Sequence, residues 1–167
     1  MNMALARNKF VAKKGLLACG VSVLITLALG ALGGLATFSS VATWYAQLNK
    51  PAFNPPNFVF GPVWTILYII MALAAWRVWL QAEGADRRTA LVLYAAQLVL
   101  NLGWSVIFFG LRQPAFALGE IIILFLAILA TIGAFWRVDR LASLMMTPYA
   151  VWVAFASFLN FGIWRLN

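Results

Sequence analysis

The sequence predicts an all-α integral membrane protein, a bundle of five transmembrane helices with one long ordered loop. Five continuous apolar stretches of 20 to 23 residues occupy most of the 167 residues, and the chain is 65% hydrophobic but only 10% charged. A 20-residue helix rises about 1.5 Å per residue and so crosses a hydrocarbon layer of roughly 30 Å. The stretches lack the alternation of membrane β-strands, which leaves the helix as the structure that satisfies their backbone in lipid.

The chain is expected to form one domain, residues 1–167, in which each apolar stretch is one helix. Three of the four connections are short, so the helices that they join should be antiparallel neighbours. The connection between the first two helices is much longer. The predicted helices are Leu16–Ala36, Pro62–Gln81, Thr89–Leu111, Phe116–Trp136 and Met145–Trp164, and the predicted loop is 37–61.

Composition excludes several classes of function. The chain has no histidine and a single cysteine, Cys19, so we expect no internal disulfide, no metal ligand set, and no Ser-His-Asp or Cys-His catalytic residues. The net charge of +8 is better explained by membrane topology and anionic lipid than by nucleic acid, because the basic residues lie between the spans. We therefore expect a lipid bilayer and no nucleic acid among the partners, and no resident cofactor.

The basic residues also predict an orientation. With the N-terminus inside, nine Lys and Arg residues fall on the inner side and only Lys50, Arg112 and Arg165 on the outer side. The positive-inside rule therefore favours an inner N-terminus and an outer C-terminus in a multi-pass membrane protein. Arg77, near the inner end of the second helix, is expected to extend to the headgroups. Glu120 lies one turn inside the fourth helix and is read as an interfacial carboxylate or, less favoured, as a functional acid.

The long outer loop differs in composition from a flexible linker. Residues 37–64 contain seven aromatic side chains, and four prolines between positions 51 and 62 lower the entropy lost on ordering. An ordered loop of this length predicts a lid over a binding site; the alternative is a belt of aromatic residues at the headgroups. The candidate lid residues are Trp44, Lys50, Pro51, Pro55 and Pro56.

Two local features help to place the ends of this loop. Ser39 or Ser40 is expected to cap a short helix that reaches about Leu48. Pro62 suits the first turn of the second transmembrane helix.

Polar and aromatic side chains share one face of the third helix. Gln97, Asn101, Trp104, Ser105 and Phe108 follow the spacing of a single helical face, which should border a cavity or another helix. For an isolated amide, a hydrogen bond between helices is the simpler explanation. Similar groups occur at the same depth on other helices, in the outer half of the membrane, and this convergence favours a pocket. The groups at this depth are Tyr68, Ala156 and Asn160. Trp64 lies one turn from Tyr68, Tyr149 and Trp152 share the stripe of Ala156, and the first helix contributes Gly30, Gly33 and Gly34. Asn160 is still expected to form a hydrogen bond between helices.

A second face of the third helix is formed by small residues. Ala96, Gly103 and Gly110 recur every seven residues, and small residues allow close contact between membrane helices. This face predicts either packing within the monomer or a homodimer through the third helix.

Three motifs resemble the signature of the TspO/MBR family, the tryptophan-rich sensory proteins and translocator proteins. The loop reads W-Y-x-x-L-x-K-P-x-x-x-P-P and then F-G-P-x-W-x-x-L-Y, over Trp44–Tyr68. The third helix continues the resemblance around Asn101 and Trp104, and the fifth around Pro148–Arg165. The resemblance implies a five-helix bundle whose first loop closes a pocket for porphyrins and other planar hydrophobic ligands.

The resemblance also implies site residues. With Gln97 and Phe155 added to the positions that match the family pocket, the candidate ligand-binding residues are Tyr45, Trp64, Tyr68, Gln97, Asn101, Trp104, Ser105, Trp152, Phe155 and Ala156. Tryptophan rings would stack on the ligand, Asn101 would anchor it and Ala156 would limit its size. Lys50 with Pro51 would hold the lid or offer a cation to a propionate. Sterol binding is disfavoured, because Phe161 stands where cholesterol-binding members have tyrosine. The chain is more similar to the bacterial members of the family, which implies a bacterial cell membrane.

The function that this resemblance implies is a membrane receptor or carrier for tetrapyrroles, with a role in their handling and in stress or environmental signalling. One alternative is light-dependent porphyrin breakdown, although no acid–base group supports ordinary turnover. The other alternative is a small-molecule transporter, although the chain has no inverted repeat and no carboxylate near mid-membrane.

Overall fold

The computed structural model describes the backbone of residues 2–167 and the side chains of residues 15–167. Within residues 2–167 every regular element is helical. The elements are α1 (Asn2–Val41), α2 (Trp44–Gln47), α3 (Asn57–Gln81), α4 (Gly84–Ser105), the π-helical segment η1 (Val106–Gly110), α5 (Pro114–Val138) and α6 (Arg140–Leu166).

Five of these helices are long and apolar enough to cross a membrane, which confirms the predicted fold class. Their lipid-facing surfaces carry large apolar side chains such as Leu24, Ile66 and Phe158, each more than half exposed, as expected for surfaces that contact lipid. The candidate spans are Gly15–Val41, Asn57–Gln81, Gly84–Gly110, Pro114–Val138 and Arg140–Leu166.

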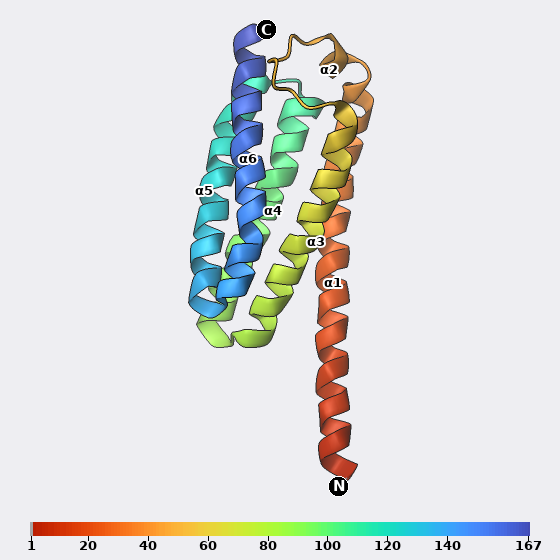
Figure 1. Cartoon of the computed structure of the whole chain (residues 1–167), viewed down its shortest axis with the longest axis vertical. Helices are drawn as coiled ribbons and strands as arrows, with labels where there is room; N and C mark the ends of the chain where they lie inside the picture. The colour runs from red at the N-terminus through yellow and green to blue at the C-terminus, as the bar shows by residue number, and fades with distance from the viewer. Residues whose placement is uncertain (1) are drawn as a thin grey trace.

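The helices pack in a closed ring with the order α1, α3, α6, α5, α4. Figure 1 shows α1 at one edge of the bundle, beside α3, with the two chain termini at opposite ends. The connection between α1 and α3 crosses the end at which α6 finishes. We call this the loop end, and the end where α3 turns into α4 the opposite end.

Helix α1 is longer than predicted. It runs through Ser39 and Ser40 to Val41, so neither serine caps the short helix that follows. Ser40 instead donates a hydrogen bond of 2.7 Å to the carbonyl oxygen of Phe109. The apolar stretch ends at residue 36, but the last turns of α1 continue beyond that residue and are held by contacts with η1 such as this bond.

The other predicted spans are present, but each is longer than its apolar stretch. Helix α3 begins at Asn57 and not at Pro62, which therefore lies inside the helix. Its first turn is closed by a bond of 3.0 Å from the Val59 amide to the Pro56 carbonyl. Helix α6 begins at Arg140, because Asp139 caps it by accepting a 2.9 Å bond from the Leu141 amide. Helix α4 begins at residue 84 instead of the predicted 89, and helix α5 ends at residue 138 instead of the predicted 136.

The last turn of the predicted third helix is π-helical. In η1 the Leu111 amide donates to the Val106 carbonyl at 2.8 Å, a spacing of five residues. The wider turn brings two consecutive rings, Phe108 and Phe109, to the same side of the segment, and both line the cavity described below. Single π turns are rare and occur often at functional sites.

A polar cluster joins α3 to the α5–α6 connection at the opposite end. Arg77 Nε and Gln81 Nε2 each donate to Asp139 Oδ2 at 2.7 Å. Arg77, predicted to extend to the headgroups, pairs with this carboxylate, and its side chain is about two-thirds buried. This pairing holds the end of α3 against the connection between α5 and α6.

Candidate ligand pocket

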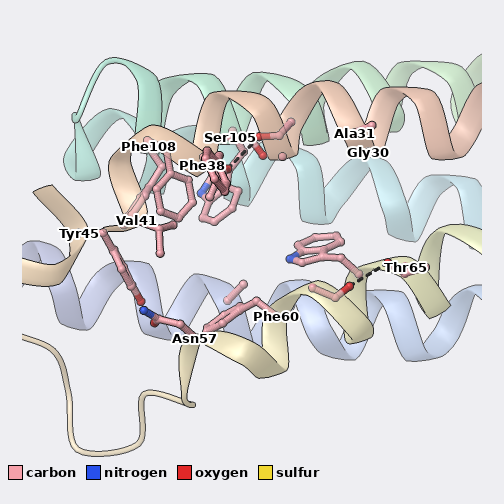
Figure 2. Close-up of a pocket in the computed structure, with 18 of the residues that line it drawn as sticks. Gly30, Ala31, Phe38, Val41, Tyr45, Asn57, Phe60, Thr65, Ser105 and Phe108 are labelled. Carbon is pink, nitrogen blue, oxygen red and sulfur yellow. Dashed lines mark hydrogen bonds between the residues drawn. The ribbon is translucent and has the colours of Figure 1, made fainter. Parts of the chain in front are cut away.

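A cavity of about 720 Å³ lies between the helices in the half of the bundle nearest the loop end. Its volume falls within the range of small-molecule sites, about 300–1,000 Å³. Figure 2 shows Phe38 and Phe108 on one side of it, Phe60 on the other, and Tyr45 toward the long connection. The aromatic residues of the lining are Phe38, Tyr45, Phe60, Trp64, Tyr68, Trp104, Phe108, Phe109 and Trp152.

The rings form two stacked pairs. Trp64 stacks on Tyr68 with centroids 5.5 Å apart and an angle of 27°, and it meets Trp152 edge to face at 6.4 Å. Trp104 stacks on Phe108 at 5.3 Å. Because each ring is packed by another ring, the aromatic walls are positioned before any ligand binds.

The polar groups of the lining are few and uncharged. Among the described residues that border the cavity there is no Asp, Glu, Lys, Arg or Cys. The hydroxyls of Thr65 and Ser105 already bond to backbone carbonyls. In contrast, Trp152 Nε1 is buried and has no acceptor among the described residues. The lining is otherwise mostly apolar and aromatic, with the exposed amide of Asn57 near the long connection.

Helix α1 contributes glycines where the cavity needs space. A Cβ atom on Gly30 would overlap the ring of Tyr68, and one on Gly33 would lie 3.2 Å from Ser105 Oγ. A Cβ atom on Gly34 would meet nothing within 4 Å. Only at Gly30 does close approach to a pocket ring itself require glycine.

The structure brings together seven of the ten candidate ligand-binding residues. Tyr45, Trp64, Tyr68, Trp104, Ser105, Trp152 and Ala156 all border the cavity. Asn101, Gln97 and Phe155 do not. Phe155 packs against Trp152 at 5.5 Å and against Phe53 at 6.3 Å, so it supports the pocket from behind.

Asn101 lies behind the wall. Its Oδ1 accepts a 2.6 Å bond from the Tyr68 hydroxyl, and its Nδ2 donates to the Tyr149 hydroxyl at 3.2 Å. The predicted role as a direct anchor is replaced by one in positioning Tyr68. Gln97 lies one turn before Asn101 in α4, farther from the loop end. It is fully buried, and neither of its polar side-chain atoms has a partner among the described residues.

Asn160 joins three elements, as the hydrogen-bonding alternative predicts. Its Oδ1 accepts from Trp104 Nε1 at 3.1 Å and its Nδ2 donates to the Pro114 carbonyl at 2.8 Å. It thereby fixes the orientation of one pocket indole while connecting α6 to α4 and α5.

The long connection is ordered by specific contacts with the loop end. Trp44 packs against Phe108 at 5.7 Å, and the Tyr45 hydroxyl donates to Asn54 Oδ1 at 2.8 Å. Burial raises the pKa of Tyr45, and the bond to Asn54 lowers it by less. Lys50 Nζ donates to the carbonyls of Ala46 and Leu48 and lies 4.8 Å from the Tyr45 ring centroid, so it holds the connection itself.

Helix α6 holds the far part of the connection. The Asn49 amide donates to Asn167 Oδ1 at 3.0 Å, and Asn167 Nδ2 returns a bond to the Asn49 carbonyl at 3.0 Å. Pro51 sits on Gly162 so closely that a Cβ atom there would lie 2.8 Å from Pro51 Cγ. Pro55 and Pro56 then lead into α3, where Pro56 is the residue before the first helical turn.

The three small residues predicted to form one face of the third helix have different surroundings. A Cβ atom on Gly103 would lie 3.6 Å from Glu120 Oε1 of α5, so this glycine allows packing within the monomer. Ala96 and Gly110 are exposed. The Glu120 oxygens are buried and have no partner among the described residues, so this carboxylate does not extend to the aqueous boundary as expected.

Sequence reasoning missed several residues of the lining. Phe60 and Phe109 approach the cavity because of the early start of α3 and the π turn, neither of which has a periodic signal. The last turns of α1 also contribute, beyond its apolar stretch. The lining residues outside the prediction are Leu27, Ala31, Thr37, Phe38, Val41, Ala42, Asn57, Phe60, Gly61, Thr65, Phe109, Leu159 and Ile163.

The fold and the cavity define a class of protein: an integral membrane protein whose five helices enclose an uncharged aromatic pocket beneath an ordered connection. Residues 22–165 match the model of the TspO/MBR family, and the chain belongs to this family.

Relatives from distant organisms cover most of the chain. The tryptophan-rich protein TspO of Chlorobaculum tepidum is 42% identical over 158 residues, 92% of this chain and 98% of its own length. The tryptophan-rich sensory protein of Cereibacter sphaeroides is 45% identical over 124 residues, 74% of this chain and 77% of its own. The human translocator protein is 41% identical over 126 residues, 74% of this chain and 75% of its own.

Proposed function

We propose that this protein is a membrane receptor that binds porphyrins and related planar, mostly apolar molecules in the aromatic pocket, and that it acts in the handling or sensing of tetrapyrroles. The observation that carries the proposal is the pair of ring stacks, Trp64–Tyr68 and Trp104–Phe108, around one cavity. Flat aromatic walls favour a flat ring system, since offset stacking adds about 0.5–1.5 kcal/mol per pair beyond burial.

The uncharged lining supports binding over catalysis. Acid–base chemistry needs a titratable group within hydrogen-bond reach of the substrate, and the described lining offers only tyrosine phenols. A receptor role also agrees with the names of the relatives, which describe a sensory protein and a translocator protein.

The unused donor on Trp152 narrows the ligand class. A buried N–H without a partner costs roughly 1–3 kcal/mol, and a ligand acceptor would recover this cost once the Trp152 indole turns its N–H into the cavity. We expect preferred ligands to combine a planar apolar ring system with one carbonyl or ring-nitrogen acceptor.

A porphyrin titration tests the proposal. Protoporphyrin added to purified protein in detergent should give a saturable shift of the porphyrin absorbance band. Replacing Trp64 and Trp152 together with alanine should abolish this shift, whereas Trp136→Ala, an exposed indole at the opposite end, should leave it unchanged. An absorbance change that does not saturate, or that survives the double substitution, would disprove the proposal.

A further inference from the structure

A second cavity opens on the lipid-facing surface of the bundle, in the half away from the aromatic pocket. It has a volume of about 590 Å³ and lies between α1 and α4, with α3 as its floor. Leu17, Ile25 and Val99 on its rims are each more than half exposed. We call it the α1–α4 groove. It is lined by Leu17, Ala18, Val21, Ser22, Ile25, Thr26, Leu29, Ala75, Trp76, Trp79, Leu91, Tyr94, Ala95, Leu98 and Val99.

The polar groups of the groove, with one exception, are satisfied within the protein. The Tyr94 and Thr26 hydroxyls are 2.8 Å apart, and Thr26 donates to the Ser22 carbonyl at 2.9 Å. Ser22 Oγ donates to the Ala72 carbonyl, and Trp76 Nε1 to the Gly15 carbonyl. Among the lining residues, only the indole N–H of Trp79, at the end nearest Arg87, has no hydrogen bond within residues 15–167. The rest of the walls suit a saturated hydrocarbon and give no polar anchor along the groove.

The length of the groove matches one leaflet. Along α1 the lining runs from Leu17 to Leu29, twelve steps of about 1.5 Å or roughly 18 Å. Half of a hydrocarbon core of about 30 Å is roughly 15 Å. An acyl chain that extends from the boundary to mid-membrane therefore fills the groove from end to end.

A cation stands at the boundary end of the groove. The guanidinium carbon of Arg87 lies 5.3 Å from the ring centroid of Trp79, which lines the groove. Arg87 Nε donates to the Ala82 carbonyl at 2.6 Å, and this bond and the indole fix the side chain. Within residues 15–167 Arg87 forms no ion pair, although exposed Glu83 and Asp86 lie in the same turn. Both Nη groups thus remain available to a phosphate.

The basic residues near this end of the groove favour a negatively charged ligand. Among the described residues, Arg77, Arg87, Arg88, Arg137 and Arg140 lie at this end of the bundle. The positive-inside rule places such an end in the cytoplasmic leaflet, where anionic lipids create a negative surface potential. A basic side chain beside a groove between helices is the arrangement that holds an anionic headgroup.

We propose that the α1–α4 groove is a binding site for an anionic phospholipid, with one acyl chain between α1 and α4 and its phosphate on Arg87. The site is separate from the aromatic pocket, since the two cavities share no lining residue. It stabilises the contact of α1 with α4 on the side that faces lipid.

Native mass spectrometry of the full chain with equimolar phosphatidylglycerol and phosphatidylcholine of identical chains tests the site. The protein should retain phosphatidylglycerol in roughly fivefold preference, and Arg87→Gln should reduce this to about twofold or less. Arg140→Gln is the matched control: Arg140 lies at the same end, 5.3 Å from the Trp136 ring, and borders neither described cavity. It should leave the preference intact.

A filling substitution tests the groove itself. Ala95→Trp should remove retention of both lipids, because the indole occupies the space of the acyl chain, and Val99→Trp at the other end provides a second such variant. Circular dichroism confirms that each variant is folded. Equal retention of the two lipids by the unmodified chain, equal losses in Arg87→Gln and Arg140→Gln, or undiminished retention in both folded tryptophan variants would each overturn the proposal.

Discussion

The Tyr68 hydroxyl donates a hydrogen bond of 2.6 Å to Oδ1 of Asn101, and both side chains are buried. Tyr68 lines the aromatic pocket and stacks on Trp64, whereas Asn101 does not reach the cavity. Asn101 also donates to Tyr149. One carboxamide thus fixes two phenols and, through Tyr68, the orientation of the Trp64 indole.

Asn101→Ala should therefore destabilise the protein more than it alters ligand contacts. Two buried hydroxyls lose their partner, at roughly 1–3 kcal/mol for each group left unsatisfied. Tyr68→Phe combined with Asn101→Leu removes both polar partners of one bond and should recover part of this loss. Thermal unfolding in detergent measures the effect, and a double variant less stable than Asn101→Ala would contradict the explanation.

Gly30→Ala should weaken ligand binding, whereas Gly34→Ala should not. The new methyl group at position 30 would overlap the Tyr68 ring and displace it, but at position 34 it would meet only open space. Both glycines are helical and line the pocket, so the pair separates packing from helix propensity, which favours alanine by about 1 kcal/mol. Protoporphyrin titrations of both variants check this, and equal affinities would show that the contact with Tyr68 is unimportant.

Trp152→Phe should distinguish ligands by their acceptors. It keeps an aromatic ring but removes the unpartnered donor, so a ligand with a carbonyl should lose roughly three- to tenfold in affinity. A matched ligand in which a methylene replaces the carbonyl should lose much less. Isothermal titration calorimetry of the two ligands against both proteins measures the difference, and parallel losses would mean that the donor plays no part.

Gly162→Ala should loosen the long connection. The added methyl group would press against Pro51, where α6 holds the connection, and the ligand should dissociate several-fold faster if the connection covers the pocket. Gly119→Ala on α5, where a methyl group meets nothing, is the control. Stopped-flow displacement of bound porphyrin gives both rates. An unchanged rate in Gly162→Ala would argue against a covering role.

Asp139→Asn should reduce stability at neutral pH but not in acid. Burial alone raises the pKa of the Asp139 carboxyl. The hydrogen bonds from Arg77 and from the Leu141 and Ala142 amides, together with the positive charge of Arg77, lower this pKa by more, so that it lies below its ordinary value. A carboxyl with a lowered folded pKa stabilises above its unfolded pKa of about 4, and this contribution is lost as pH falls below that value.

We expect Asp139→Asn to lower the free energy of unfolding at pH 7 by about 1–2 kcal/mol. This is near the lower end for charge-assisted hydrogen bonds, because the side chain of Arg77 is one-third exposed and its charge is screened by solvent. Thermal unfolding of both proteins from pH 7 to pH 3 tests this. The two midpoints should converge in acid, and a constant gap across this range would exclude the ionised pair as its cause.

The sequence determined the fold class and seven of the residues that line the pocket. Five apolar stretches of spanning length leave few alternatives to a helical bundle, because lipid leaves no backbone group without a partner. Helical spacing then placed Trp64 with Tyr68 and Trp152 with Ala156 on shared faces, and all four line the cavity. The motifs added Tyr45, which periodicity alone does not place.

Only the tertiary structure decided which polar groups face the ligand. Asn101 and Trp104 share a helical face, yet the Tyr68 phenol lies between Asn101 and the cavity, and no spacing rule predicts that contact from another helix. The π turn that presents Phe108 and Phe109 together depends on bonds between η1 and its neighbours, such as that from Ser40. Periodicity reports which residues share a side of one helix, whereas the depth and rotation of each helix are set by packing against the others.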